Sequence, residues 1–133
     1  GKMQEKALEL EMSQTSFFDP AGLSVLTQST AHDAEKLVVY ILKTHPDIFE
    51  ITSNASVTIN ELSSGSPRII PNNNPLAARQ DFLGGKTGYT ENANGNLISL
   101  FKHNGHEILI IVFGTGDRFG ETEKLYAWAK HYL

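Results

Sequence analysis

Two apolar runs separated by a short polar turn restrict the fold of this chain more than any other feature. Residues 96–102 (NLISLFK) and 107–113 (EILIIVF) are rich in β-branched, aromatic and other apolar side chains that favour strands. Between them stands HNGH, whose Asn104-Gly105 pair tolerates the positive φ angles of a type I′ turn. We therefore predict an antiparallel hairpin here, and a third extended segment at 82–87.

Helical periodicity predicts three helices around this hairpin. The first spans 3–11, and the second begins after Thr30, where Thr30-x-x-Asp33 resembles a capping box, and stops before Pro46. One further helical turn is expected at 47–51. The last helix is predicted within ETEKLYAWAKHYL at the end of the sequence. Its expected sheet-facing side chains are Leu125, Trp128, Ala129 and Tyr132.

The segments between these elements are short or irregular. Residues 55–59 alternate and are β-branched, which predicts a short strand. Residues 60–75 are dense in Asn, Ser, Pro and Gly, and we expect a long loop with one short extended piece at Arg68–Ile70. Residues 12–29 are expected to form an irregular connection that Phe17 and Phe18 hold against the core.

The order of the elements indicates the fold class. Helix, helix, strand, loop, three strands and helix is the pattern of an α+β protein, in which helices pack on an antiparallel sheet. A length of 133 residues favours a single domain spanning 1–133, and it is sufficient to bury a core.

Composition excludes several kinds of protein. A net charge of −4 and an isoelectric point of about 5.7 argue against a nucleic-acid partner. Cysteine is absent, which excludes disulfides, thiolate metal sites and cysteine nucleophiles. The longest apolar run, ILIIVF, is far shorter than a membrane span. The sequence begins with GKMQE, which has no signal-peptide pattern and equally fits an internal cut in a longer protein.

The stretch 81–96 (DFLGGKTGYTENANGN) raises the question of a phosphate-binding loop, because GKT matches the end of a Walker A motif. The complete motif requires a glycine where this chain has Gln80, and its loop opens a helix. Here Gly88 and asparagine-rich turn residues follow instead. We therefore reject a nucleotide site.

A substrate-binding edge strand is the functional interpretation of the same residues. Lys86 would offer a compact cation, and Thr87 a hydroxyl, to a substrate carboxylate. The flanking glycines carry no Cβ, so a ligand backbone could lie against the strand. The other interpretation is a glycine-rich strand end and turn without a ligand. Three residues by themselves do not decide between the two.

Three longer segments resemble, in the same order, the D-alanyl-D-alanine carboxypeptidases, which are low-molecular-mass serine penicillin-binding proteins. The family's helix and Asn/Asp-Pro-x-Gly-Leu turn are similar to KMQEKALELEMSQTSFFDPAGLS. Its Ser-Thr-Ala-x-Asp helix is similar to STAHDAEKLVVYILKTHPDIFEIT. Its asparagine-rich approach, Lys-Thr-Gly strand, hairpin and closing helix are similar to the rest of the chain, from NNNPL through GGKTGYT to RFGETEKLYAWA. The resemblance covers nearly the whole sequence.

The resemblance implies a penicillin-binding and β-lactamase-like transpeptidase fold. It also implies a serine-type carboxypeptidase that removes the terminal residue from peptidoglycan stem peptides ending in D-Ala-D-Ala. β-Lactams are expected to trap the complete enzyme, no cofactor is expected, and the expected location is the bacterial cell envelope outside the cytoplasm.

The same resemblance assigns roles to four residues. Lys86 is expected to support catalysis and to position the substrate, Thr87 to bind the substrate carboxylate, and Gly88 to leave room for it. Arg118 is expected to be a second cation for that carboxylate. Its other interpretation is a solvated residue near the start of the last helix.

This chain departs from the family pattern in several respects. The family's Ser-x-x-Lys nucleophile and Ser-x-Asn element both precede the matched segments. The single Ser-x-x-Lys here, Ser99 to Lys102, falls in a predicted strand, where side chains three apart point to opposite faces. Gly85 stands where the family usually has a bulky aliphatic residue, and we expect it to loosen the strand.

Two accounts of the chain follow from these departures. It is either the C-terminal half of a catalytic domain or a noncatalytic module that binds peptidoglycan or peptides. In the family the sheet includes strands from the N-terminal part, so we expect an exposed edge here. That edge is expected to pair with the missing N-terminal half or with a second copy of the chain.

Other polar residues predict no further site. His103 and His106 flank the expected turn, but no third ligand is adjacent, so we expect no metal site. Glu121, Glu123 and Lys124 are expected to form a solvated helix face.

Overall fold

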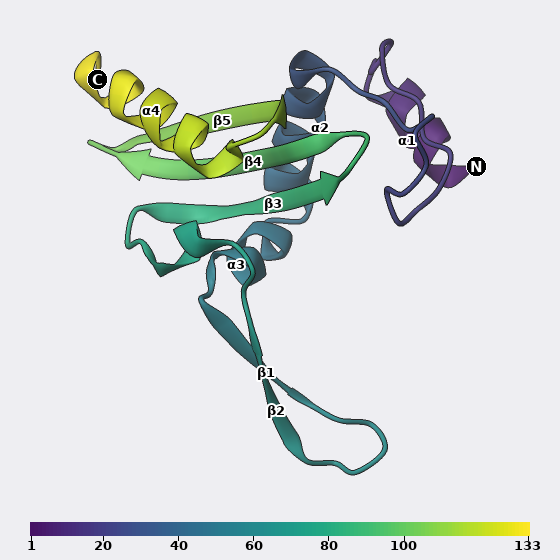
Figure 1. Cartoon of the computed structure of the whole chain (residues 1–133), viewed down its shortest axis with the longest axis vertical. Helices are drawn as coiled ribbons and strands as arrows, with labels where there is room; N and C mark the ends of the chain where they lie inside the picture. The colour runs from purple at the N-terminus through teal and green to yellow at the C-terminus, as the bar shows by residue number, and fades with distance from the viewer.

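The predicted hairpin forms the centre of the protein, whose computed structural model describes residues 1–133 (Figure 1). β4 (Asn94–His103) pairs antiparallel with β5 (His106–Thr115), and β3 (Phe82–Thr90) pairs with the other side of β4. The two central turn residues have φ angles of 49° and 83°, which confirms the predicted turn. β4 is therefore the central strand, and β3 and β5 are the two edges.

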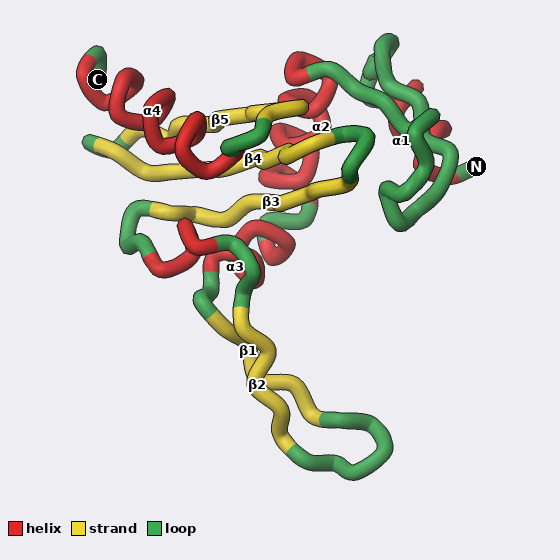
Figure 2. The backbone as a smooth tube through the Cα atoms, viewed as in Figure 1, coloured by secondary structure: helices red, strands yellow, loops and turns green.

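Helices cover both faces of this sheet, which confirms the predicted α+β class. α2 (Ala31–Thr44) and α3 (Asp47–Ser53) pack on one face, and α4 (Arg118–His131) packs on the other (Figure 2). Alternate side chains of β4 enter two separate cores. Towards α4 the main buried side chains are Leu97, Phe101, Ile108, Ile110, Val112 and Tyr126, and towards α2 and α3 they are Val38, Phe49 and Leu100.

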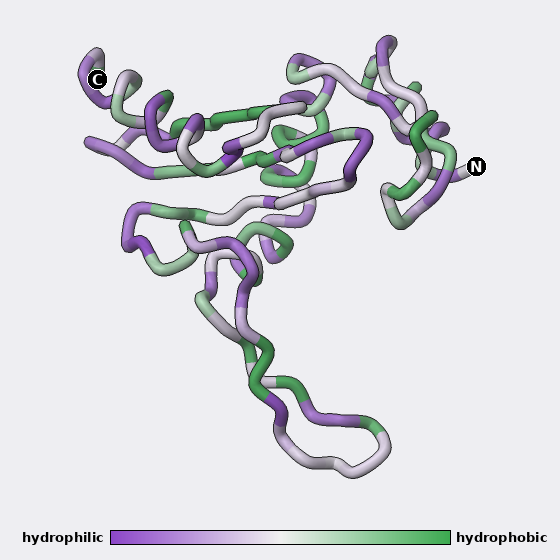
Figure 3. The backbone as a smooth tube through the Cα atoms, in the orientation of Figure 1, coloured by the Kyte–Doolittle hydropathy of each residue, from purple (hydrophilic) through white to green (hydrophobic).

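β5 carries a long hydrophobic stretch at the edge of the sheet (Figure 3). From Ile108 to Phe113 it contains neither a charged residue nor a proline, and its outer side has no partner strand. Native edge strands are commonly protected by charge, proline or a covering element. β5 therefore has the composition of a central strand while occupying an edge position.

The N-terminal lobe, formed by α1 (Lys2–Glu9) and the irregular segment after it, is attached to the start of α2. Thr30 caps α2 as predicted, its hydroxyl accepting from the N–H of Asp33 at 3.2 Å. The buried carboxylate of Asp33 does not complete the capping box. It accepts instead from the N–H of Gln14 and the hydroxyl of Thr15, both at 2.8 Å. Burial opposes its ionisation, yet these bonds hold the pKa of Asp33 below its usual range.

The two phenylalanines of the lobe differ from their prediction. Phe18 is 63% exposed, so it does not hold the connection against the core. Phe17 is half-buried and lies beside Met3 and Met12 of the lobe itself. The lobe is thus held by polar contacts to α2 rather than by aromatic packing on the sheet.

The sheet-facing side of α4 differs in part from the one predicted. Ala129 packs against the core as expected, but Leu125 is 44% exposed. Trp128 and Tyr132 are 63% and 67% exposed, whereas Tyr126 is completely buried. α4 is apolar on both sides, so residue spacing alone could not identify the buried side. The ring of Tyr126 stacks on Phe101 of β4 with centroids 4.1 Å apart, and this contact determines how the helix is rotated. No helix of the protein combines the length and the apolar composition needed to cross a bilayer.

A β-hairpin arm projects from the body of the protein (Figure 1). The predicted strand at 55–59 is confirmed as β1 (Ser56–Asn60), which pairs with β2 (Pro67–Pro71). The extended piece predicted at Arg68–Ile70 is confirmed as part of β2. The long loop predicted over 60–75 is wrong in part, because this piece pairs with β1 in a hairpin and Pro75 begins a 3₁₀ helix, η1 (Pro75–Ala78). Two prolines suggested a loop, but β2 has only one partner strand and can accommodate residues that lack an N–H.

A cluster of charged and aromatic side chains fastens α4 to the start of β3. Arg79 donates two bonds of 2.9 Å to Asp81 and two of 3.0 Å to Glu123, and the Tyr126 hydroxyl donates to Asp81 at 2.9 Å. Arg79 and Tyr126 hold the pKa of Asp81 at about 2, although burial works in the other direction. Burial and the neighbouring Asp81 raise the pKa of Tyr126 to about 12.

Replacing Asp81 with Asn should lower the free energy of unfolding near neutral pH by about 1–2 kcal/mol, an amount reduced by partial solvent exposure. Asp81 has a lowered pKa in the folded state, so its contribution is present above the unfolded-state value of about 4. It is lost as the pH falls towards about 2. Urea unfolding measured across this pH range should therefore show that the free energy of unfolding falls more steeply with decreasing pH for the wild type than for Asp81→Asn.

The matched control for this experiment is Glu123→Gln, which removes the more exposed partner of Arg79. This substitution should lower the free energy of unfolding by less than about 1 kcal/mol, because exposed ion pairs contribute little to stability. Parallel pH profiles for the wild type and Asp81→Asn would contradict the assigned role of this carboxylate.

Candidate substrate-binding site

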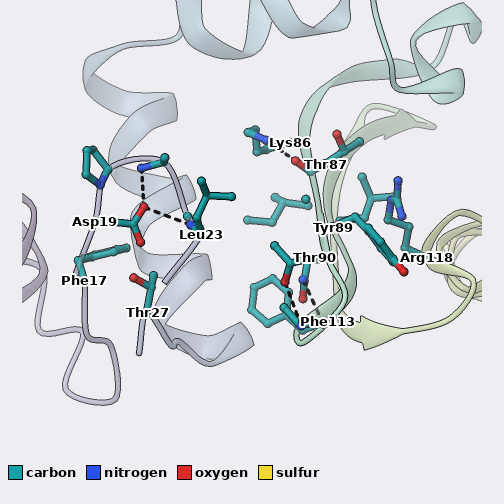
Figure 4. A pocket seen from close by; sticks show the side chains of 18 of the residues that line it. Phe17, Asp19, Leu23, Thr27, Lys86, Thr87, Tyr89, Thr90, Phe113 and Arg118 are labelled. Carbon is teal, nitrogen blue, oxygen red and sulfur yellow. Dashed lines mark hydrogen bonds between the residues drawn. The ribbon is translucent and has the colours of Figure 1, made fainter. Parts of the chain in front are cut away.

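The four residues predicted to bind substrate line one hollow with a volume of about 640 Å³. Lys86, Thr87 and Gly88 line it from β3, and Arg118 lines it from the start of α4. Figure 4 shows the opposite wall, which the N-terminal lobe supplies through the segment around Asp19. The structure therefore brings together residues that are far apart in the sequence.

The pleat of β3 directs Lys86 and Thr87 to opposite faces of the sheet. Lys86 pairs with Ile98 of β4, whose side chain packs towards α2 and α3. Thr87 pairs with Leu97, whose side chain enters the core under α4. Arg118 begins α4, so it belongs to the Thr87 face. Adjacent residues of one motif thus serve two sides of the strand.

Both cations of the site lack a carboxylate partner. The ammonium of Lys86 is exposed and donates to the backbone carbonyl of Thr87, and it forms no ion pair. Arg118 forms no ion pair either, and its buried Nε has no hydrogen-bond partner. Its guanidinium lies 5.8 Å from the Tyr89 ring centroid and 4.7 Å from that of Phe119. A hollow lined by two cations without carboxylate partners, with a hydroxyl on the Arg118 side, is suited to an anion such as a carboxylate.

Gly95 and Gly88 differ in the space that surrounds them. A Cβ at Gly95 would lie 2.7 Å from the carbonyl oxygen of Thr115 in β5 and 3.2 Å from Cβ and Cδ of Arg118. This glycine therefore permits the close approach of β5 and also leaves room for the arginine. At Gly88 the nearest atom to a Cβ would be 3.8 Å away, on Asn96. The fold therefore does not require glycine at position 88. The space that it leaves open is available to a ligand.

The expected loosening of β3 at Gly85 is not observed. A Cβ at this position would lie 2.2 Å from the carbonyl oxygen of Ile98, so glycine permits a close approach of β3 to β4. Pairing continues without interruption from Gly84 to Thr90, after an irregularity between Phe82 and Gly84. Gly85 also donates its N–H to the hydroxyl of Thr52 in α3, at 3.1 Å. The strand is held from two sides.

Asp19, the acidic residue in the opposite wall, forms hydrogen bonds with the backbone of its own loop. The carboxylate of Asp19 accepts from the N–H groups of Ala21, Leu23 and Ser24 at 2.8, 3.1 and 2.7 Å. The bonds from Ser24 and Leu23 hold the pKa of Asp19 below its usual range. This carboxylate therefore remains an acceptor of backbone bonds and forms no ion pair with Lys86.

Asn73 is a further residue of the site that was not predicted from the sequence. It lines the hollow, and its Oδ1 accepts from the Thr87 hydroxyl at 3.3 Å. It stands in a run of three asparagines that was interpreted only as part of a loop. The run itself was the available signal, because asparagine side chains commonly bond to nearby backbone and fix the course of a loop.

The internal Ser-x-x-Lys is excluded as a nucleophile by its position. Ser99 is completely buried beneath α4, and its hydroxyl has no hydrogen-bond partner. Lys102 is exposed at the other end of β4 and lies opposite Glu107. The structure contains no group of three or more His, Asp or Glu side chains arranged to hold a metal ion.

Comparison with known proteins identifies relatives of one kind. The family model described as D-alanyl-D-alanine carboxypeptidase matches residues 1–117. A D-alanyl-D-alanine endopeptidase of Haemophilus influenzae is 37% identical over 105 residues, covering 77% of this chain and 35% of that protein. The protein of the same description from Escherichia coli is 29% identical over 131 residues. This match covers 95% of this chain and 42% of that protein. The chain spans less than half the length of either curated relative.

Solved structures give the same result for the fold. Penicillin-binding protein D2 from Listeria monocytogenes, in its cefotaxime-bound form, superposes with a TM-score of 0.81 and 32% identity. The match covers 95% of this chain and 52% of that one. The D-alanyl-D-alanine carboxypeptidase of Mycobacterium tuberculosis gives a TM-score of 0.82 and 26% identity. This match covers 96% of this chain and 51% of that one. The predicted penicillin-binding fold is confirmed, and the chain belongs to the D-alanyl-D-alanine carboxypeptidase family.

Proposed function

We propose that this chain supplies the carboxylate-recognition wall of a serine-type D-Ala-D-Ala carboxypeptidase that acts on peptidoglycan stem peptides. The observation that carries the proposal is that Arg118, on the Thr87 face of β3, and Lys86, on the opposite face, line one hollow with Thr87, and neither cation forms an ion pair. Gly88 follows Thr87 in β3 and leaves open space in the same hollow. A peptide carboxylate has the charge and the acceptor oxygens that this arrangement fits.

The free edge of β3 supports an extended mode of binding. β3 pairs with β4 on one side only, so its other edge has backbone groups available to a peptide strand. With the peptide in this position, Thr87 and Arg118 bind the terminal carboxylate. Lys86, on the opposite face, supplies positive charge where the reaction takes place. Lys86 is therefore the proposed catalytic residue of this half of the site.

The proposed reaction needs a nucleophile from polypeptide beyond these 133 residues, because Ser99 is buried in β4. We propose that residues 1–133 correspond to the C-terminal half of a catalytic domain. The matched regions support this, since they cover 35% and 42% of the curated relatives. Such a protein would act on the cell wall, so the proposed location is the bacterial envelope outside the cytoplasm.

A noncatalytic peptidoglycan- or peptide-binding module is the second candidate. It is favoured by one observation, which is that the carboxylate-binding groups are present in a chain without an accessible nucleophile. The two candidates share Lys86, Thr87, Gly88 and Arg118 as the binding residues. They differ in whether a covalent acyl-enzyme forms.

The relatives also pose a question of substrate, because the curated ones are named endopeptidases. A carboxypeptidase removes a terminal residue, whereas an endopeptidase cleaves an internal bond. We propose terminal cleavage, since the cations of this site suit a free carboxylate. Product analysis with a linear stem peptide and a cross-linked one would separate the two activities.

A fluorescent penicillin should label the longer protein that contains this sequence and should not label the isolated chain. Labelling requires a serine nucleophile, and two of the solved neighbours are described as cefotaxime- and ampicillin-bound forms of penicillin-binding protein D2. Lys86→Ala in the longer protein should slow labelling by about tenfold or more, because a charge beside the reacting group is lost. Gel fluorescence measures both effects. An unlabelled longer protein would refute the enzymatic proposal and favour the binding module.

An acetylated D-Ala-D-Ala peptide should bind the isolated chain weakly, and Lys86→Ala and Arg118→Gln should each lower its affinity by about tenfold. For Arg118 this is the size expected when one hydrogen bond to a charged group is lost, and for Lys86 it reflects the loss of a nearby positive charge. Amide chemical-shift titration measures the affinity. Lys124→Ala is the control, because this lysine pairs with Glu121 on α4 and does not line the hollow. Equal affinity for a peptide whose C-terminus is amidated would contradict carboxylate recognition.

We also propose that β5 pairs with another strand, either from the missing N-terminal half or from a second copy of this chain. Its unprotected apolar edge supports this partner. The isolated chain should therefore show a mass that rises above the monomer with concentration in light scattering. Phe113→Lys places a charge on an exposed position of β5 and should shift the chain towards the monomer. A wild-type monomer at all concentrations would count against self-association.

A further inference from the structure

Three consecutive asparagines beside β3 do not have equivalent roles. Asn72 donates to the carbonyls of Thr52 and Asn54, both at 2.9 Å, and its Oδ1 accepts from the N–H of Asn74 at 2.9 Å. The Oδ1 of Asn74 accepts from the N–H of Leu76 at 3.1 Å and caps η1. Both side chains are thus committed to fixing the backbone of this segment.

Asn73, between them, is not used in this way. Its side chain is exposed to the hollow, and its one hydrogen bond is the 3.3 Å contact that its Oδ1 accepts from the Thr87 hydroxyl. The two neighbouring asparagines therefore hold the backbone in a position that presents Asn73 to Thr87. No bond to the protein backbone prevents the Asn73 amide from turning.

The proton of the Thr87 hydroxyl cannot serve two acceptors at once. A hydroxyl has one proton to donate, and in the free protein Thr87 donates it to Asn73. An ionised carboxylate only accepts hydrogen bonds, so it requires that same proton. A half-turn of the Asn73 amide resolves the conflict. Its Nδ2 then donates to the Thr87 oxygen, and the hydroxyl proton becomes free for the ligand.

We propose that Asn73 is a positioning residue that switches the Thr87 hydroxyl from a bond within the protein to a bond with the substrate carboxylate. The proposal rests on the proposed function of the site, since it requires a ligand that accepts the proton. Asn73 acts through Thr87, so its effect should disappear when the Thr87 hydroxyl is absent. It should also disappear when the ligand has no carboxylate.

The test measures binding of two ligands, acetyl-D-Ala-D-Ala and its C-terminal amide, by amide chemical-shift titration of the isolated chain. Asn73→Asp keeps the acceptor and the shape but cannot donate to Thr87. It should lower the affinity for the carboxylate ligand by about tenfold and change that for the amide much less. Asn96→Asp is the control for added charge, because Asn96 also lines the hollow without contacting Thr87. It should lower affinity by no more than about threefold, as expected for an exposed charge.

A double substitution tests whether Asn73 acts through Thr87. Thr87→Val removes the hydroxyl and keeps the branched shape, and adding Asn73→Ala to it should cause no further loss of affinity. In the wild type, the side-chain amide signals of Asn73 should shift with the carboxylate ligand and not with the amide ligand. A purely structural role for Asn73 would not produce this difference between ligands.

The outcomes separate the two proposals. If the wild type prefers the carboxylate ligand but Asn73→Asp retains that preference undiminished, the switch is refuted and the proposed function stands. If the effects of Asn73→Ala and Thr87→Val are additive, the coupling through Thr87 is also refuted. If the wild type shows no preference for the carboxylate ligand, the proposed function fails, and the switch fails with it because no acceptor exists for the proton.

Discussion

The central strand β4 is the element on which the rest of the structure depends. Its alternate side chains enter the cores on both faces of the sheet, and the strand β3 is attached mainly by pairing with it. This pairing determines more than stability. Because Lys86 lies opposite Ile98 and Thr87 opposite Leu97, the register assigns the two neighbouring residues to different faces. A shift of one residue would exchange them and separate Thr87 from Arg118.

The glycines of the motif now have distinct physical roles. Gly85 allows β3 to approach the carbonyl of Ile98, and Gly95 accommodates the carbonyl of Thr115 and the side chain of Arg118. Gly88 faces open space, which is the feature expected where a ligand approaches. A motif that looks uniformly flexible in the sequence is therefore largely a set of close contacts, with one position left free.

The hollow is bounded by two parts of the molecule that are held together indirectly. β3 forms one wall, and the other belongs to the N-terminal lobe, which is tied to α2 through the buried carboxylate of Asp33. The solved relatives are about twice as long as the matched region. The matched region therefore corresponds to about half of each of these solved chains.

Local sequence signals determined a large part of this protein. The turn at Asn104-Gly105, the cap at Thr30 and the alternation of the strands all depend on interactions between near neighbours, so they were predictable. The resemblance around GGKTG likewise led to the family. The hairpin arm was missed in part, because the prolines of β2 suggest a loop unless the strand is known to lie at an edge.

Only the tertiary structure decided the features that depend on contacts between distant residues. The buried side of α4 follows from Tyr126 stacking on Phe101 and bonding to Asp81, neither of which is near it in the sequence. The meeting of Asn73 with Thr87 depends on the course of a loop that Asn72 and Asn74 fix. Sequence spacing reports periodicity within one element, but it carries no information on which distant side chain fills the facing position.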